Sequence, residues 1–313
     1  MLEIIDLHTG ATLSGCNSSV ICLGNFDGVH RGHAELIRQT VELKKKLAGK
    51  HSGILGGAWC FRQPPAEFLF GKEHLCLTTT DEKLKLFSEL GLDIAVLGDF
   101  PSMRNMTPQF FAKEILVDSL GCRAAVCGFN FKFGKDGAGT PKMLNEYVGE
   151  DCITVDPVML DGDVISSSRI RELLSNGDAE EAERLLGHPY SAELKVVKGK
   201  MLGREWGIPT LNQFFSKEKF VPANGVYAST VSLNGKEYIS VSNVGTNPTV
   251  GDVGVRCETH ILDFSGDLYG ETVKVSFRKF LRGERKFTDV EALKAAIFEN
   301  IRETREFFKD KNM

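Results

Sequence analysis

Two histidines three positions apart stand in a glycine-rich turn, GNFDGVHRGH, at residues 24–33. Glycine lets the backbone approach a ligand closely, and the N–H groups at the start of the helix expected next suit a phosphate. His30 and His33 can face the same bound group and stabilise charge as pyrophosphate leaves. The turn is therefore predicted to bind nucleotide phosphates, together with its first residues, Gly24, Asn25, Phe26, Asp27 and Gly28. A metal site on the histidine pair and a pair without function are the alternatives.

A second anion site is predicted at ISSSRIR, residues 165–171, where another helix begins. Serine caps helices, which accounts for one of the serines. The run of serines followed by arginines makes a better anion site, because guanidinium groups bind phosphate oxygens. The residues predicted to contact nucleotide phosphates here are Ser166, Ser167, Ser168 and Arg169.

The segment GFNFKFGKDGAG, residues 128–139, follows a predicted strand. Open α/β sheets bind ligands beyond the carboxyl ends of their strands. Phe129, Phe131 and Phe133 can stack on a flat ring, and packing in the core is the equal alternative. Asn130 can read a base edge or a flavin carbonyl.

In the second half, GKMLGREWGIPTLN at residues 199–212 is glycine-rich but lacks the G-K-[ST] of a Walker A loop. Thr210 and Asn212 are two positions apart, so they share one face if the chain is extended. Their oxygens can hold Mg²⁺ and phosphate.

A charged strand face is predicted farther on, where Arg256, Glu258 and His260 alternate with less polar residues. One interpretation is the solvated exterior of a barrel. The other is that Glu258 acts as a general base on a substrate hydroxyl.

The elements that must position the first motifs alternate between strand and helix. Apolar runs predict strands at residues 20–23, 54–61, 94–97, 124–127 and 153–155. Helices are predicted after residue 30, from a Thr79–Glu82 capping box to Gly91, from Thr107 to Gly121, at 169–174, and from an Asp178–Glu181 capping box to residue 186. Repeated βα units of this length predict a parallel sheet covered on both faces.

The pattern changes near residue 187, which predicts two domains, 1–186 and 187–313. Strands now follow each other directly at residues 192–197, 225–233, 236–241, 255–263 and 272–280. Asn234-Gly235 is a strong hairpin signal, and the run predicts an antiparallel barrel or sandwich. A final helix is expected, capped by Thr288 with Glu291 and with an apolar stripe of Val290, Leu293, Ile297 and Ile301.

Composition limits the classes of protein that fit. The chain of 313 residues has a net charge of -4 and eight cysteines without a C-x-x-C pair. These features predict free thiols in a reducing compartment and argue against a nucleic-acid binder. No apolar run is long enough for a membrane span and no secretory signal is visible. We therefore expect a cytoplasmic protein with small-molecule partners and no nucleic-acid or membrane partner, for which an oligomer is possible.

Together these motifs resemble the prokaryotic bifunctional riboflavin kinase/FMN adenylyltransferases, also called FAD synthetases, over nearly the whole chain. GNFDGVHRGH is similar to the family's adenylyltransferase signature, a variant of the HxGH signature of a nucleotidyltransferase superfamily. Residues 199–212 resemble its flavokinase signature. The other segments that match in order are GFNFKFG, ISSSRIR, PANGVYA, NVGTNPT, ETHILDFSGDLYG and LRGERKF.

The resemblance implies a Rossmann-like nucleotidyltransferase domain followed by a β-barrel flavokinase domain with a C-terminal helix. It implies that riboflavin and ATP give FMN in the barrel, and that FMN and ATP give FAD and pyrophosphate in the first domain, both with Mg²⁺. Glu258 would deprotonate the ribityl hydroxyl, and Thr210 and Asn212 would hold the Mg²⁺-nucleotide.

In the adenylyltransferase, the resemblance implies that His30 and His33 steady the ATP phosphates with Ser167, Ser168 and Arg169.

Further nucleotide contacts would come from Gly199, Gly203 and Arg204, which belong to the flavokinase signature. The flavin contacts would come from Phe129, Asn130, Arg282 and Glu284.

The chain departs from the family pattern at a few positions. The segment FRQPP, with Pro64, lacks the histidine of the usual F-x-P-H-P-like segment. Asn247 stands where arginine is common, and Ser168 where threonine is usual. Three other functions are considered: a chain with only one active half, a flavin-binding regulator without turnover, and a nucleic-acid-binding protein with a barrel domain.

Overall fold

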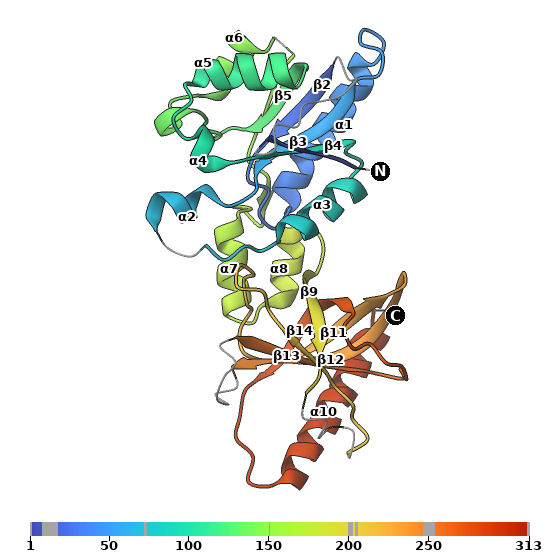
Figure 1. Ribbon diagram of the computed structural model, residues 1–313. Coiled ribbons are helices and arrows are strands. Elements are labelled where there is room, and N and C mark those ends of the chain that lie inside the picture. Colours follow the sequence, from blue (N-terminus) through green and yellow to red (C-terminus); the bar gives the residue numbers. More distant parts are fainter. Residues whose placement is uncertain are drawn as a thin grey trace. The chain divides into compact units, whose positions relative to one another are not determined.

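The computed structural model describes residues 2–7, 18–71, 74–149, 151–199, 203, 206–246 and 254–311. By packing, the chain divides into two compact units, Met1–Ser166 and Ser167–Met313 (Figure 1). None of the helices in these ranges is both long and apolar enough to cross a lipid bilayer.

The first unit is built on a parallel sheet whose strands lie in the order β1-β4-β3-β2-β5-β6. Its strands are β1 (Glu3–Asp6), β2 (Ser19–Leu23), β3 (Leu55–Phe61), β4 (Ile94–Gly98), β5 (Cys122–Gly128) and β6 (Ile153–Val155). A short antiparallel hairpin of β7 (Met159–Leu160) and β8 (Asp163–Val164) follows the sheet.

Helices cover both faces of this sheet, because its central strands are apolar on both sides. On one face α1 (Arg31–Leu47) and α3 (Thr80–Glu89) contribute Ile37 and Phe87 to a core with alternate residues of the central strands. On the other face the π-helix (Phe111–Ser119) and α6 (Pro141–Tyr147) contribute to a second core. The remaining helices are α2 (Pro65–Phe70), α4 (Phe100–Met103), α5 (Pro108–Phe110) and a 3₁₀ turn at Lys135–Gly137.

The sequence predicted five of the six strands of the sheet, β2 to β6, and missed the edge strand β1, whose four residues EIID carry no clear apolar run. The Thr79–Glu82 capping box is present, with both of its hydrogen bonds. The helix predicted from Thr107 begins at Pro108 as expected but changes hydrogen-bond pattern at Phe111, and Leu120 N donates to Ile115 O at 3.2 Å.

The second unit is a closed antiparallel barrel with strands in the order β10-β13-β12-β11-β14-β9 (Figure 1). The predicted fold class, a parallel sheet followed by an antiparallel barrel with a C-terminal helix, is confirmed. The elements of this unit are α7 (Ser167–Ser175), α8 (Ala179–Leu186), β9 (Tyr190–Val197), β10 (Leu211–Phe214), β11 (Gly225–Leu233), β12 (Lys236–Thr246), β13 (Val255–Ile261), β14 (Thr272–Gly283) and α10 (Val290–Lys309).

Helices α7 and α8 pack with the barrel. Ala223 N donates to Leu174 O at 2.9 Å, and Arg278 of β14 pairs with Glu183 of α8 at 3.2 Å. The packing unit therefore begins before residue 187. The boundary at 186/187 between two functional domains stays a prediction.

Side chains alternate between the interior and the exterior of the barrel. Inside, the buried hydroxyls of Ser229, Ser242 and Thr259 form a chain, with oxygen distances of 2.8 Å and 2.9 Å between neighbours. Each buried hydroxyl in this chain has a partner, which removes most of the cost of burying it. The residues between them, such as Glu258, therefore point outward.

Two of the predicted capping boxes differ in the structure. Asp178 is the N-cap residue of α8, as predicted, but its side chain makes no capping hydrogen bond. At α10 the N-cap is Asp289 rather than Thr288, and Asp289 Oδ1 accepts a hydrogen bond from Ala292 N at 2.8 Å. Thr288 and Asp289 are adjacent cap-forming residues, so the pattern alone did not choose between them.

Thr79→Ala should lower the free energy of unfolding by about 1 kcal/mol, because Thr79 Oγ1 accepts the Glu82 N–H of the capping box at 3.3 Å. Thr79→Ser keeps the oxygen and should remain close to wild type. Urea unfolding curves test this, with Ser88→Ala at an exposed position of the same helix as the control. Equal losses in Thr79→Ala and Ser88→Ala would contradict the assignment.

Candidate functional site

The GNFDGVHRGH turn lies between β2, which ends at Leu23, and α1, which begins at Arg31. It is therefore at the carboxyl end of a central strand of a parallel sheet, where such sheets bind ligands. The turn is tightly coiled, because Phe26, Gly28 and Val29 have positive φ values of 51°, 82° and 42°. Positive φ is unfavourable for side chains such as those of Phe26 and Val29, so contacts must hold the turn in place.

Part of the motif supplies those contacts. Asp27 Oδ1 accepts a hydrogen bond from Leu77 N at 2.8 Å, and Gly28 N donates to Thr78 Oγ1 at 3.0 Å. The Phe26 ring is buried in the core against Phe87. The sequence predicted that Phe26 and Asp27 bind nucleotide. These contacts give both side chains a role in holding the turn, and their contact with nucleotide stays a prediction.

The two histidines stack on each other at the start of α1. Their ring centroids are 3.7 Å apart, with planes inclined by 16°. His30 is the N-cap of α1, and its Nδ1 accepts a hydrogen bond from the main-chain N–H of His33 at 3.3 Å. In a neutral His30 ring this bond assigns the proton to Nε2.

The Nδ1 atom of His33 is buried and has no hydrogen-bond partner in the described part of the chain. Burial, more than the charges of His30 and Lys83, lowers the pKa of His33 well below its ordinary value of 6.5. His33 is therefore neutral at physiological pH, and it can donate one N–H to an anion but carries no charge of its own.

The segment after β5 offers exposed side chains next to its strand. Phe129 is 50% exposed and Asn130 is also exposed, whereas Phe133 is buried in the core. Phe131 is half-buried against the same core. Phe129 is thus the ring of this segment that remains available to stack on a ligand, and core packing accounts for Phe133.

The predicted serine site is divided between the units. Ser166 is the last residue of the first unit, and Ser167, Ser168 and Arg169 open α7 in the second. Their participation in a phosphate site with the histidines stays a prediction.

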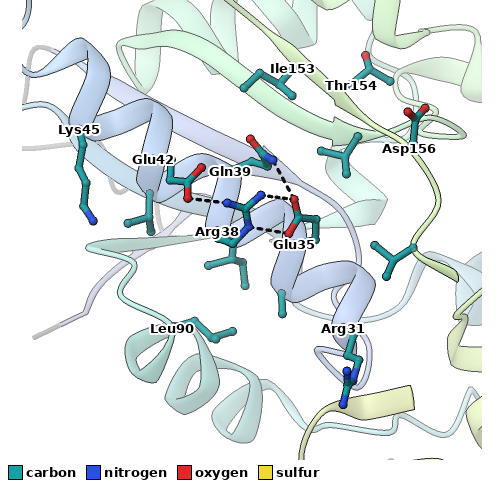
Figure 2. Close-up of a pocket in the computed structure, with 15 residues that line it drawn as sticks. Arg31, Glu35, Arg38, Gln39, Glu42, Lys45, Leu90, Ile153, Thr154 and Asp156 are labelled. Carbon is teal, nitrogen blue, oxygen red and sulfur yellow. Dashed lines mark hydrogen bonds and ion pairs between the residues drawn. The ribbon is translucent and has the colours of Figure 1, made fainter. Parts of the chain in front are cut away.

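The first unit also has a wide groove of about 960 Å³ between α1 and β6, drawn in Figure 2. Figure 2 shows that Glu35, Arg38, Gln39 and Glu42 of α1 bond to one another along the helix. Arg38 reaches Glu35 at 2.6 Å and Glu42 at 2.5 Å. Because these charges are already paired, they do not converge on a ligand.

The second unit has a pocket of about 440 Å³ in which the barrel wall meets α10. It gathers the kinase-side residues that the sequence singled out. Those among its lining residues are Gly203, Thr210, Asn212, Arg256, Glu258, His260, Arg282 and Glu284. Apolar side chains of α10 line it too, and they include Leu293, Ile297 and Ile301 of the predicted stripe. Val290 of that stripe is 48% exposed.

Strand register aligns the polar groups of this pocket. Asn212 of β10 and Asn243 of β12 are both paired with Glu258 of β13, one on each side. Side chains paired in this way on one face lie about 5 Å apart at Cβ. The pocket wall therefore carries a carboxylate between two amides. Asn243 was not singled out, because its alignment with Glu258 depends on strand register, which the sequence pattern does not give.

The Glu258 carboxylate is held by its neighbour. Arg256 Nη1 is 3.0 Å from Glu258 Oε1, and the Arg256 guanidinium lies over the Phe214 ring. His260 Nδ1 is 2.8 Å from Pro209 O, which ties β13 to the chain before Thr210. The charged face is therefore the wall of a pocket rather than an open barrel exterior.

Two glycines, Gly199 and Gly245, pack against residues that line this pocket. A Cβ on Gly199 would overlap the Asn212 side chain, so a larger residue there would displace Asn212. Arg282 Nε donates to Asn300 Oδ1 at 3.2 Å, and burial lowers the pKa of the Arg282 guanidinium. Glu284 lies directly over Gly245, where a Cβ would overlap its carboxylate. Arg204 and Asn247 lie outside the described residues.

The seven cysteines in the described ranges are free thiols. Burial raises the pKa of Cys22 and of Cys257 to about 12. Thiols that stay protonated are poor nucleophiles, so these two cysteines serve packing.

Comparisons with known proteins match both units. The model of the FAD synthetase family matches residues 14–169, and that of the riboflavin kinase family matches residues 186–308. A "Bifunctional riboflavin kinase/FMN adenylyltransferase" of Listeria monocytogenes is 34% identical and covers 93% of each chain. The protein of the same name from Escherichia coli K12 is 35% identical over 95% of this chain and 94% of its own.

A solved structure has the same fold over almost the whole chain. It is the "Crystal Structure of Macrolide-efflux Protein from Streptococcus pneumoniae", with a TM-score of 0.85 and 31% identity over 97% of this chain and 99% of that one. The name macrolide-efflux protein belongs to the streptococcal chain alone, and the similarity here supports the two-unit fold.

The low pKa of His33 makes stability depend on pH. Below about pH 6.5 the unfolded chain protonates this histidine and the folded chain does not. Folded stability should therefore fall as the pH drops, by up to about 1.4 kcal/mol per pH unit from this residue. Urea unfolding between pH 7.5 and 5.5 should show a steeper loss for wild type than for His33→Gln. Parallel pH profiles would contradict the assignment, and His51→Gln, outside the motif, serves as the control.

Proposed function

The chain belongs to the family of bifunctional riboflavin kinase/FMN adenylyltransferases, and we propose that it makes FAD from riboflavin in two ATP-dependent steps. The barrel unit phosphorylates riboflavin to FMN. The parallel-sheet unit transfers AMP from ATP to FMN and releases pyrophosphate. One observation carries this proposal: the FAD synthetase match, residues 14–169, falls almost wholly on the first unit, and the riboflavin kinase match, residues 186–308, falls on the second, where it includes the residues of the polar barrel pocket.

In the kinase step, Glu258 accepts the proton of the terminal ribityl hydroxyl. The hydroxyl oxygen then attacks the γ-phosphorus of ATP, and the bond from that phosphorus to the oxygen shared with the β-phosphate breaks, which yields FMN and ADP. The position of Glu258 on the pocket wall supports this role, because a general base must reach the proton it takes. Arg256 Nη1 lies 3.0 Å from Glu258 Oε1 and holds the carboxylate in place on that wall.

The donor set beside Glu258 fits Mg²⁺. Thr210 and Asn212 present a hydroxyl and an amide to the pocket, and magnesium prefers oxygen ligands completed by substrate phosphates. Thr210 and Asn212 would hold the ion, which supplies charge neutralisation for the phosphates of ATP. The described residues contain no cluster of three or more His, Cys, Asp or Glu side chains that could hold a metal without such phosphates.

We assign flavin binding in the barrel unit to the same pocket. Arg282 and Glu284 line it together with the Phe287 ring, over which the Arg282 guanidinium lies at 5.6 Å from the centroid. A planar guanidinium and a ring in one wall suit a flat aromatic ligand. Gly203 lines the pocket too, and Gly199 and Arg204 belong to the same nucleotide-binding segment.

In the adenylyl transfer, the phosphate of FMN is already ionised at pH 7 and needs no general base. One of its oxygens attacks the α-phosphorus of ATP, and pyrophosphate leaves. His30 and His33 donate hydrogen bonds to the phosphates, and the N–H groups at the start of α1 add to them. The absence of charge on His33 fits a hydrogen-bond donor rather than an acid. Phe129 and Asn130 seat the flavin, and phosphate binding by Ser167, Ser168 and Arg169 stays a prediction from the sequence.

One assay tests both halves. The protein is incubated with ATP and Mg²⁺ and either riboflavin or FMN, and the flavins are resolved by chromatography. FAD from riboflavin supports two active halves. FAD from FMN alone would leave a single adenylyltransferase, and no product from either flavin would leave a flavin-binding protein without turnover.

Glu258→Gln should reduce FMN formation by about 100-fold or more, because general base catalysis is lost while the side chain keeps its size. The rate of FAD formation from supplied FMN should stay at the wild-type value. Glu271→Gln, at an exposed barrel position outside the pocket, is the matched control. Loss of both activities in Glu258→Gln would refute the division of labour between the units.

His33→Ala should have the opposite effect. FAD formation from FMN should fall by about 100-fold, because a donor to the developing phosphate charge is lost. FMN should then accumulate from riboflavin at the wild-type rate. His51→Ala should retain both activities, and a normal rate of FAD formation in His33→Ala would exclude His33 from the site.

A further inference from the structure

A buried lysine lies beside the GNFDGVHRGH turn. Lys83 of α3 is only 7% exposed, and its Nζ donates to the main-chain oxygen of Asn25 at 2.9 Å. Asn25 is the second residue of the turn. No carboxylate pairs with Lys83 in the part of the chain that the structure describes. Among these described residues, the ammonium group therefore has a main-chain oxygen as a partner and no carboxylate.

The charge of Lys83 acts on residues of both the turn and the sheet beneath it. It lowers the pKa of His33, after burial and His30. It also lowers the pKa of the Cys60 thiol of β3, against the larger effect of burial. Lys83 thus lies close enough to His33 for its charge to be felt in a shielded environment.

Three contacts from residues 77–83 hold the turn, and the hydrogen bond from Lys83 is one of them. The other two come from residues 77 and 78, which bond to Asp27 and Gly28. The capping box of α3 fixes the start of the helix that carries Lys83. The turn is strained, so losing one of these contacts would let its donors shift.

An uncharged donor could also make the hydrogen bond to the Asn25 carbonyl, so this bond alone does not account for a lysine at this position. A buried ammonium without a carboxylate is costly, and an anion bound nearby offsets that cost. The N–H groups at the start of α1 and the side chains of the two histidines also favour an anion at the turn. An anion of high charge at the turn would complete this arrangement.

We propose that Lys83 is a positioning residue for the adenylyl transfer, whose buried ammonium clamps the turn through Asn25 and supplies the positive charge that a bound triphosphate or pyrophosphate completes. The proposal rests on the proposed function of the first unit. Lys83 acts from beneath the turn, through Asn25 and through its field at His33. It transfers no proton and forms no bond to the reacting atoms.

The test uses the full chain with Lys83→Gln, which keeps an N–H donor but removes the charge, and Lys83→Met, which removes both. Lys85→Gln, at an exposed position of the same helix, is the matched control. Riboflavin kinase activity and urea unfolding are measured for each variant, so that a folding defect is recognised. The probe is inorganic pyrophosphate, titrated by calorimetry.

Both Lys83 variants should bind pyrophosphate about tenfold more weakly and show a similar rise in the KM for ATP, because a shielded charge next to the anion is lost. The KM for FMN and the kinase activity should remain at wild-type values. The pKa of His33, followed by NMR of labelled histidine, should rise in both variants and stay below 6.5, since burial is its larger cause.

Pyrophosphate affinity equal to wild type in Lys83→Gln would overturn the proposal and leave Lys83 a structural clamp. An unchanged His33 pKa in both variants would overturn it as well. Failure of the proposed function gives a different result, because wild type itself would then form no FAD from FMN. The pyrophosphate titration of wild type against Lys83→Gln still decides the role of the lysine in that case.

Discussion

Strand pairing is the constraint on which both candidate sites depend. In the parallel sheet, neighbouring strands end at one edge, so the turns after β2 and β5 emerge there together. In the barrel, the register of β10, β13 and β12 sets Asn212, Glu258 and Asn243 in a row on the outer face. A shift of one residue in β13 would bury the Glu258 carboxylate inside the barrel, because successive side chains point to opposite faces.

The two units meet different chemical demands with different electrostatics. In the proposed kinase step a ribityl hydroxyl must lose a proton, and the barrel provides the Glu258 carboxylate, paired with Arg256, on a pocket wall. The phosphate of FMN needs no base, and the first unit provides neutral or positive groups instead. These groups are the stacked histidines, the start of α1 and the buried ammonium of Lys83. The proposed chemistry of each acceptor thus fits the kind of residue found in each unit.

Within the GNFDGVHRGH signature, residues divide between holding the turn and facing a ligand. Phe26 fills the core and Asp27 binds the backbone at Leu77, while His30 caps α1 and aligns its ring with His33. The positive φ values of the turn explain why so many contacts are devoted to holding it. A signature of this kind therefore records the stability of the turn as much as the binding of nucleotide.

The sequence by itself determined the two fold classes, the central strands, the Thr79 cap and the identity of the polar segments, because periodicity, caps and glycines act over a few residues. Only the tertiary structure decided the rest. The short strands β1 and β10 form through pairing with the distant strands β4 and β13, and Asp289 caps α10 in competition with the adjacent Thr288. The roles of Asp27, Asn243 and Lys83 depend on partners that are about 15 to 60 positions away in the chain. No local pattern contains such contacts, since they exist only once the sheets have closed.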